Sequence, residues 1–203
     1  MDYNIEKEAL EQGYKKVCGT DEAGRGPLAG PVFAAAVILP CGAFDAGLLD
    51  LGLNDSKKLS PKRREALYDI ICERSVRYAV ATASVEEIDE INILNAAMLA
   101  MRRAVEALDM CPGLILVDGN KKPGTDIEEW VIIGGDGLSP SIAAASILAK
   151  VSRDRYMAEL DKQYPQYCFA KHKGYGTKLH YDMLAEYGPS PVHRKSFNLG
   201  VNI

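Results

Sequence analysis

The residues best suited to chemistry are two adjacent carboxylates, Asp21 and Glu22, in a segment rich in glycine and proline. Carboxylate oxygens bind hard cations such as Mg²⁺, and a cation beside an open backbone can hold a phosphate group. Gly24 and Gly26 flank Arg25, so main-chain N–H groups can approach a ligand and the guanidinium can reach a phosphate. The alternative interpretation is an acidic turn at the end of a strand.

Two further aspartates follow strand-like segments later in the chain. The apolar run 114–117 predicts a strand buried on both faces, and it ends at Asp118. Open α/β sheets place their chemistry at such carboxyl ends. Asp136 lies in the glycine-rich segment 134–137, before a predicted helix. Simpler interpretations are a turn before glycine for Asp118 and compensation of the helix dipole for Asp136. Taken with Asp21 and Glu22, however, the two aspartates favour a shared metal site.

A basic loop with an aromatic residue lies near the C-terminus. Residues 171–177 include Lys173 and Tyr175, and the tyrosine lies between two glycines. Such a ring can lie flat against a sugar or base while lysines contact phosphates; the alternative is an ordinary surface loop. Residues 150–203 carry 9 Lys and Arg against 5 Asp and Glu, whereas the whole chain has a net charge of −4. This asymmetry suits a metal site beside a phosphate-binding surface.

The composition limits the class of protein. A chain of 203 residues that is 47% hydrophobic and 26% charged is typical of one globular domain with a substantial core. The N-terminus lacks the apolar region of a signal peptide, and no apolar run could span a bilayer. Scattered cysteines without a Cys-x-x-Cys pair argue against a zinc site or a disulfide framework. We therefore expect a cytoplasmic protein with no membrane association. The cysteines are Cys18, Cys41, Cys72, Cys111 and Cys168.

Capping residues and hydrophobic periodicity predict alternating strands and helices, which is an α/β class. Ser60 and Pro61 open a helix that continues to about Cys72, and Ser84 with Glu87 forms a capping box for a short helix. The predicted strands span 14–21, 32–39, 77–83, 114–117 and 130–133, with residues 40–42 closing the second. The other predicted helices span about 1–13, 92–108, 141–163 and 178–187.

Several of these segments resemble the signatures of one enzyme family, bacterial ribonuclease HII, the type 2 ribonuclease H family. They follow in the same order from about residue 14 to residue 197. The sister family, ribonuclease HIII, carries Gly-Thr-Gly where this chain has Gly24-Arg25-Gly26, so the arginine favours ribonuclease HII. The matching segments are 19–32, 54–59, 117–120, 135–136, 141–147, 149–151, 173–177, 188–189 and 193–197.

The resemblance implies a ribonuclease H-like fold, with a central mixed five-stranded sheet flanked by helices and a C-terminal helical segment. We expect a single domain over 1–203, with a core at about 14–163 and a basic helical segment at about 164–203. The resemblance also implies an active site of four carboxylates, which would repel one another without cations. These catalytic and metal-binding residues are Asp21, Glu22, Asp118 and Asp136.

The reaction implied is hydrolysis of a phosphodiester with two Mg²⁺ or Mn²⁺ ions, held about 4 Å apart by these carboxylates. One ion would lower the pKa of the attacking water, and the other would stabilise the departing 3′ oxygen. The products would carry a 5′-phosphate and a 3′-hydroxyl. All-oxygen ligation fits Mg²⁺ and Mn²⁺ rather than zinc, and no histidine is needed as a general base.

The implied substrates are RNA–DNA hybrids, cut in the RNA strand, and duplex DNA with single ribonucleotides, cut on their 5′ side. Selectivity must then depend on the 2′-hydroxyl. The family contacts this hydroxyl with its Gly-Arg-Gly main chain, here Gly24-Arg25-Gly26, and stacks a tyrosine, here Tyr175, on the adjoining deoxyribose. Lys57 and Lys173 would bind phosphates.

Three other functions stay open. Another ribonuclease H-like nuclease, such as a junction resolvase, would share the carboxylates but would not need Gly24-Arg25-Gly26 or Tyr175. A non-catalytic nucleic-acid-binding module would tolerate loss of the acidic residues. A phosphatase of small phosphoesters would have no use for the basic tail. We expect a monomer and infer no protein partner, because residues 199–203 show no peptide typical of sliding-clamp binding.

Overall fold

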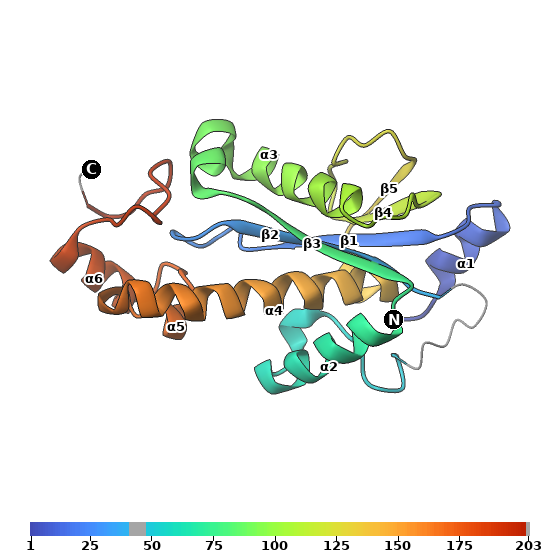
Figure 1. Cartoon of the computed structure of the whole chain (residues 1–203), viewed down its shortest axis with the longest axis horizontal. Coiled ribbons are helices and arrows are strands. Elements are labelled where there is room, and N and C mark those ends of the chain that lie inside the picture. The colour runs from blue at the N-terminus through green and yellow to red at the C-terminus, as the bar shows by residue number, and fades with distance from the viewer. Residues whose placement is uncertain (41–47, 202–203) are drawn as a thin grey trace.

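The computed structural model describes residues 1–40 and 48–201, which form a layered α/β arrangement (Figure 1). Cys41 and Gly42, which belong to the segment predicted to close the second strand, and residues 202–203 of the tail lie outside the described residues. The elements are α1 (Asn4–Glu11), β1 (Val17–Ala23), β2 (Val32–Ile38), η1 (Ser56–Lys58), α2 (Pro61–Arg74), β3 (Arg77–Ala83), α3 (Val85–Glu106), β4 (Leu114–Asp118), β5 (Glu129–Ile132), η2 (Gly135–Gly137), α4 (Pro140–Gln163), η3 (Pro165–Tyr167), α5 (Phe169–His172) and α6 (Lys178–Tyr187).

Five strands form one mixed sheet in the order β3-β2-β1-β4-β5, which confirms the predicted sheet. The pairs β1–β2 and β2–β3 are antiparallel, whereas β4 is parallel to both β1 and β5. The parallel register places Thr20 opposite Val117. The next residues, Asp21 and Asp118, therefore reach the same end of the two central strands.

The first strand differs from the predicted strand 14–21 at both ends. It begins at Val17, after a left-handed residue at Lys16 with φ of 57°. At the other end it continues through Glu22 and Ala23, which pair with β2. The two carboxylates thus lie inside a paired strand, and the interpretation as a turn at the end of a strand is wrong.

Helices cover both faces of the sheet, with α3 on one side and α2 and α4 on the other (Figure 1). Successive side chains of a strand point to opposite faces. In β2, Ala34 and Ala36 accordingly pack in the cluster of α3, whereas Ala35 and Val37 pack in the cluster of α2 and α4. All seven residues of β2 are buried, which explains its unbroken apolar sequence.

The kinked helix α3 confirms the two helices predicted on either side of residue 92. Ser84 and Glu87 form the predicted capping box at its start. Asn92 has non-helical dihedral angles, with φ of 66° and ψ of 162°. Its side-chain oxygen accepts hydrogen bonds from the N–H groups of Leu94 and Asn95. Asn92 therefore caps the second part of α3.

The N-terminus of α4 is fixed by two buried side chains. Ser139 accepts a hydrogen bond from the N–H of Ile142 at 3.2 Å, as an N-cap does. Glu6 of α1 accepts from the Ser139 hydroxyl at 2.6 Å and from the N–H of Ser141 at 3.1 Å. The start of α4, and with it the preceding η2, is held against α1.

The C-terminal segment packs on the part of α4 that extends beyond the sheet (Figure 1). Met157 and Leu160 of α4 form an apolar cluster with Tyr167 and Phe169. The short helix α5 lies between left-handed residues at positions 168 and 173, and sequence periodicity did not predict it because four residues show no period. No helix of the described chain combines the length and apolar character that crossing a membrane requires.

The close packing of β1 on α4 gives a stability prediction. A Cβ added at Gly19 would lie 2.2 Å from the main-chain carbon of Ser141. Gly19→Ala should therefore lower the free energy of unfolding by about 3 kcal/mol, because overpacking forces the sheet and helix apart. Gly137→Ala is the matched control, since a Cβ there meets nothing within 4 Å, and its effect should stay within about 0.5 kcal/mol. Urea unfolding measures both, and equal effects would contradict the prediction.

Candidate active site

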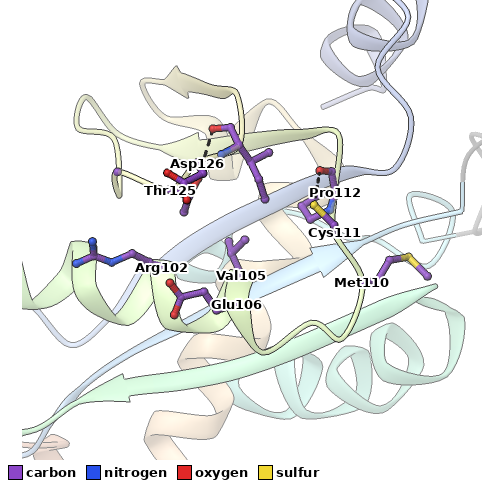
Figure 2. Close-up of a pocket in the computed structure, with 10 residues that line it drawn as sticks. Arg102, Val105, Glu106, Met110, Cys111, Pro112, Thr125 and Asp126 are labelled. Carbon is purple, nitrogen blue, oxygen red and sulfur yellow. Dashed lines mark hydrogen bonds between the residues drawn. The ribbon is translucent and has the colours of Figure 1, made fainter.

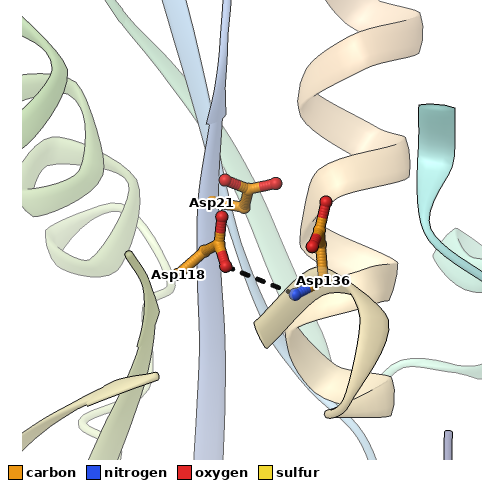
Figure 3. Close-up of side chains that lie close together, drawn as sticks. All are labelled: Asp21, Asp118 and Asp136. Carbon is orange, nitrogen blue, oxygen red and sulfur yellow. Dashed lines mark hydrogen bonds between the residues drawn. The ribbon is translucent and has the colours of Figure 1, made fainter. Parts of the chain in front are cut away.

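Three aspartates from three elements converge at one end of the central strands (Figure 3). Asp21 lies in β1, Asp118 ends β4, and Asp136 lies in η2. One carboxylate oxygen from each lies within 4.8 Å of the other two. The main-chain N–H of Asp136 also donates to Asp118 Oδ1 at 3.3 Å. The structure therefore brings together three of the four carboxylates named from the sequence.

Glu22 lies beside this group rather than within it. Because Glu22 follows Asp21 on the same strand, its side chain points to the face of the sheet opposite to that of Asp21. Its carboxylate accepts a hydrogen bond from Arg25 at 3.2 Å. Both residues line the same groove as Asp21 and Asp118, with a volume of about 230 Å³. Glu22 is thus in reach of a ligand in the groove, but its metal-binding role stays a prediction.

Burial and crowding oppose ionisation of Asp21, Glu22 and Asp118. Burial raises the pKa of Asp21 well above its usual range, and the charges of Glu22 and Asp118 raise it further. Burial also raises the pKa of Asp118, with a contribution from Asp136. The pKa of Glu22 is raised by burial against the opposing effect of Arg25. A divalent cation would relieve this repulsion, and an all-oxygen donor set fits Mg²⁺ or Mn²⁺.

Lys57 reaches the carboxylates from η1. Its Nζ donates to Asp136 Oδ2 at 2.9 Å, and this hydrogen bond raises the pKa of the lysine. Asp55 holds the turn by accepting from the Lys57 N–H at 2.9 Å. The Lys57 side chain is 77% exposed. The Lys57 side chain is therefore free to turn towards a phosphate if a metal cation binds to Asp136 and displaces the lysine ammonium group.

The segment 24–26 and Tyr175 form another part of the groove. Gly24 has φ of 103°, which favours glycine. A Cβ at Gly26 would lie 3.7 Å from the Tyr175 ring, so the bare glycine leaves space beside that ring. Tyr175 is 43% exposed, and Lys150 Nζ lies 6.0 Å from its ring centroid. An aromatic surface and main-chain groups thus face the same space as the carboxylates.

The three histidines form a buried cluster behind Tyr175 and do not line the groove. His180 Nδ1 lies 3.0 Å from the Tyr175 carbonyl oxygen, and His180 Nε2 lies 3.0 Å from His193 Nε2. The ring of His172 stacks on that of His180. Burial lowers the pKa of His180 and of His193 to about 4. Both are therefore neutral at pH 7 and serve to support the tyrosine loop.

Lys173 lies in an adjoining cleft rather than in the groove. This cleft has a volume of about 410 Å³ and is also lined by Arg64, Lys150, Arg155 and Lys171. Lys150 lines both hollows, so the basic surface is continuous with the acidic site. Phosphate binding by Lys173 stays a prediction.

Sequence reasoning assigned no role to two groove residues on α4, Ser146 and Lys150. The Ser146 hydroxyl lies 2.8 Å from that of Ser56, and a hydrogen bond to Asp21 opposes the rise in the pKa of that carboxyl. Lys150 pairs with Asp154 at 2.7 Å. Ser146 and Lys150 are four residues apart on a largely apolar stretch of helix, which places them on one face. This spacing could have indicated from the sequence that both side chains reach the same site.

A larger cleft of about 560 Å³ lies between the end of α3 and the segment before β5 (Figure 2). Arg102 and Glu106 of α3 line it, with Thr125 and Asp126 across from them. None of the site residues named from the sequence is among the described residues that line it. The acidic groove, although smaller, is therefore the better candidate for an active site.

The mixed sheet and its helical layers define a ribonuclease H-like fold. Ribonuclease H2 from Pyrococcus horikoshii OT3 matches this structure with a TM-score of 0.76 at 28% sequence identity, over 91% of this chain and 95% of that chain. This likeness confirms the predicted fold and places the chain in the ribonuclease H class.

Sequence comparison identifies the family within that class. The family model described as Ribonuclease HII matches residues 18–199. Ribonuclease HII of Caldicellulosiruptor saccharolyticus is 52% identical over 195 residues, covering 96% of this chain and 93% of that protein. Ribonuclease HII of Burkholderia pseudomallei is 57% identical over 181 residues, covering 89% and 82%. This chain belongs to the ribonuclease HII family and is a hydrolase of the ribonuclease H type, which confirms the resemblance.

The raised pKa of Asp21 predicts that replacing its carboxylate with a neutral group stabilises the metal-free protein. A carboxyl whose pKa is higher in the folded state stabilises the protein below its unfolded pKa, and this stability is lost as the pH rises through the folded pKa. In EDTA at pH 7.5, Asp21→Asn should therefore raise the free energy of unfolding by about 1 kcal/mol, or about 2–4 °C in Tm. The advantage should shrink as the pH falls towards 5.

Thermal unfolding across this pH range measures the effect. The control is Asp182→Asn, an exposed helix residue paired with Lys178, which should stay within about 0.5 kcal/mol at every pH. Adding Mn²⁺ should raise the Tm of the unmodified protein more than that of Asp21→Asn. A variant that is less stable than the unmodified protein in EDTA would contradict the prediction.

Proposed function

We propose that this protein is a divalent-cation-dependent endonuclease that cleaves the RNA strand of RNA–DNA hybrids and cuts duplex DNA on the 5′ side of single ribonucleotides. The observation that supports it most is the convergence of Asp21, Asp118 and Asp136, with carboxylate oxygens within 4.8 Å of one another. The groove that holds Asp21 and Asp118 is also lined by main-chain groups and an aromatic ring. Such a protein would act, as a monomer in the cytoplasm, on ribonucleotides left in DNA.

The donor set fits two Mg²⁺ or Mn²⁺ ions. Asp21, Glu22, Asp118 and Asp136 would hold them, since these residues offer only oxygen ligands and burial opposes ionisation of the first three. When bound, the ions supply the charge that activates water and stabilises the departing 3′ oxygen. The protein's part is to keep the carboxylates on rigid elements, with Asp21 held within the paired strand β1.

Two cations already paired with the carboxylates would guide the phosphate. Lys57 donates to Asp136 and Arg25 donates to Glu22, so each holds a carboxylate in place in the free protein. Their side chains are 77% and 50% exposed. Both groups can therefore turn to the phosphate oxygens of a bound strand.

Selectivity for a ribonucleotide would come from the segment 24–26 and Tyr175. A 2′-hydroxyl both donates and accepts hydrogen bonds, so main-chain groups close to the groove can distinguish it from a deoxyribose carbon. The Tyr175 ring offers a flat apolar surface to the next sugar. The two loops are joined by a hydrogen bond from the Leu28 N–H to the Gly174 carbonyl oxygen at 2.8 Å, which fixes their spacing.

The first activity prediction concerns the acidic group. Asp21→Asn should lower kcat for a duplex with one ribonucleotide by about 10³-fold, because it removes a ligand whose contribution to the transition state is several kcal/mol. Binding of the duplex should persist, since the change removes negative charge from the groove. Asp126→Asn, in the larger cleft, is the control and should keep full activity.

A gel assay with Mg²⁺ or EDTA, and fluorescence anisotropy of the same labelled duplex, give the two quantities. An all-DNA duplex and a four-way junction complete the substrates. Full activity of Asp21→Asn would remove this residue from the site, and cleavage of the junction in preference to the ribonucleotide duplex would favour a resolvase.

The second activity prediction concerns the tyrosine. Tyr175→Ala should lower kcat/KM at a single embedded ribonucleotide by about tenfold, the equivalent of roughly 1.4 kcal/mol of lost stacking. Cleavage of a long RNA–DNA hybrid should fall less, because many equivalent sites are available. Tyr78→Ala is the matched control, because Tyr78 is 42% exposed on β3 and does not line the groove. Equal losses on both substrates would remove the stacking role.

A further inference from the structure

Two arginines are completely enclosed by the protein. Arg153 on α4 is 1% exposed, and Arg194 in the C-terminal segment is 0% exposed. A buried guanidinium is normally paired with a carboxylate. Here, within the described residues, all six hydrogen bonds that the two groups make go to main-chain carbonyl oxygens.

Arg194 donates hydrogen bonds to carbonyl groups of the glycine-rich segment 24–30, which follows β1. It donates to the carbonyl oxygens of Gly24 at 2.6 Å, Arg25 at 3.0 Å and Gly30 at 2.9 Å. Two of these three acceptors belong to the segment 24–26. The planar fork of the guanidinium thus fixes the orientation of consecutive peptide groups.

Arg153 joins the same segment to the tyrosine loop. It donates to the carbonyl oxygens of Ala29 at 3.1 Å and Pro31 at 3.3 Å, and to that of Lys173 at 3.0 Å. Lys173 lies two residues before Tyr175. A Cβ at Gly24 would lie 2.2 Å from Arg153 Nε, so the segment touches this guanidinium directly. One side chain therefore bridges the two loops, in addition to the hydrogen bond between Leu28 and Gly174.

The direction of these carbonyl groups determines where the N–H groups point. In a trans peptide, the carbonyl oxygen and the next N–H lie on opposite sides of the chain. Because the carbonyl oxygens of Gly24 and Arg25 face Arg194, the N–H groups of Arg25 and Gly26 point away from it. Both of these residues line the groove. Neither N–H donates to another main-chain group of the described residues.

We propose that Arg153 and Arg194 are positioning residues for ribonucleotide recognition. By binding the carbonyl oxygens of Gly24 and Arg25, Arg194 presents the N–H groups of Arg25 and Gly26 to the groove. By binding those of Ala29 and Lys173, Arg153 holds Tyr175 opposite them. This inference rests on the proposed function, because it takes the 2′-hydroxyl of a ribonucleotide as the group bound there.

The charges of the two arginines support this arrangement. Burial lowers the pKa of Arg153 to about 10 and that of Arg194 to about 9, so both remain protonated at pH 7. Two positive charges behind the segment strengthen the N–H groups as donors to an oxygen atom. Lysine cannot replace either residue, because an ammonium group is a compact charge without the planar fork.

The test replaces each buried arginine with lysine, which keeps the charge and removes the fork. Arg153→Lys and Arg194→Lys should each lower kcat/KM at a single ribonucleotide by about tenfold or more, equivalent to the loss of one well-placed interaction. Mn²⁺ binding to the metal-free protein should change less than about twofold, since no carboxylate is altered. Arg103→Lys on α3 is the control, because Arg103 donates to the Thr82 carbonyl oxygen and to Glu87 away from the groove.

Kinetics are measured on duplexes with one ribonucleotide, an RNA–DNA hybrid and all-DNA, together with Tm and Mn²⁺ titration. If Arg153→Lys and Arg194→Lys fold and cleave at a single ribonucleotide as well as Arg103→Lys does, the positioning role is overturned. If the unmodified protein does not distinguish the ribonucleotide duplex from all-DNA, the proposed function itself fails, and the two failures are thereby separate.

If the lysine variants do not fold, amide hydrogen exchange of the unmodified protein decides. In EDTA, where no cleavage occurs, a duplex with one ribonucleotide should protect the N–H groups of Arg25 and Gly26, and an all-DNA duplex should not. Equal protection by the two duplexes, or none by either, would overturn the inference.

Discussion

The arrangement of the site depends on holding three acidic side chains close together against their mutual repulsion. Asp21, Asp118 and Asp136 lie within 4.8 Å of one another, and burial makes their repulsion stronger than it would be in water. Rigid supports make this arrangement possible, because each aspartate lies in or beside an element with fixed neighbours. Asp21 is inside a strand paired on both sides, and Asp136 precedes a helix whose N-terminus is tied to Glu6 and Ser139.

Helix α4 connects this acidic centre with the surfaces around it. Its small first half lets Gly19 of β1 approach the helix backbone. Ser146 and Lys150 line the groove, and Arg153 on the next turn donates to the carbonyl oxygens of Ala29 and Lys173. One helix thus links packing, the acidic site and the basic surface, so a shift of α4 would disturb all three at once.

Much of this was predictable from local sequence. The capping residues, the apolar run before Asp118 and the carboxylates near strand ends depend on neighbours in the chain, and the segment resemblances gave the fold. The other features depend on contacts between residues that are far apart in the sequence. The pairing of Glu22 and Ala23 with β2 extends the first strand, and nothing local indicates it. Arg153 and Arg194 resemble surface residues in the sequence because their carbonyl partners are brought together only by folding.

The proposed mechanism requires four carboxylates to hold divalent ions where a scissile phosphate can bind. Anomalous X-ray diffraction from crystals grown with Mn²⁺ and a duplex carrying one ribonucleotide with a cleavage-resistant phosphate tests it most directly. We expect two Mn²⁺ peaks among Asp21, Glu22, Asp118 and Asp136, both in contact with that phosphate. Saturating Mn²⁺ with no peak in this groove, or with peaks only elsewhere, such as beside Glu106 and Asp126, would contradict it.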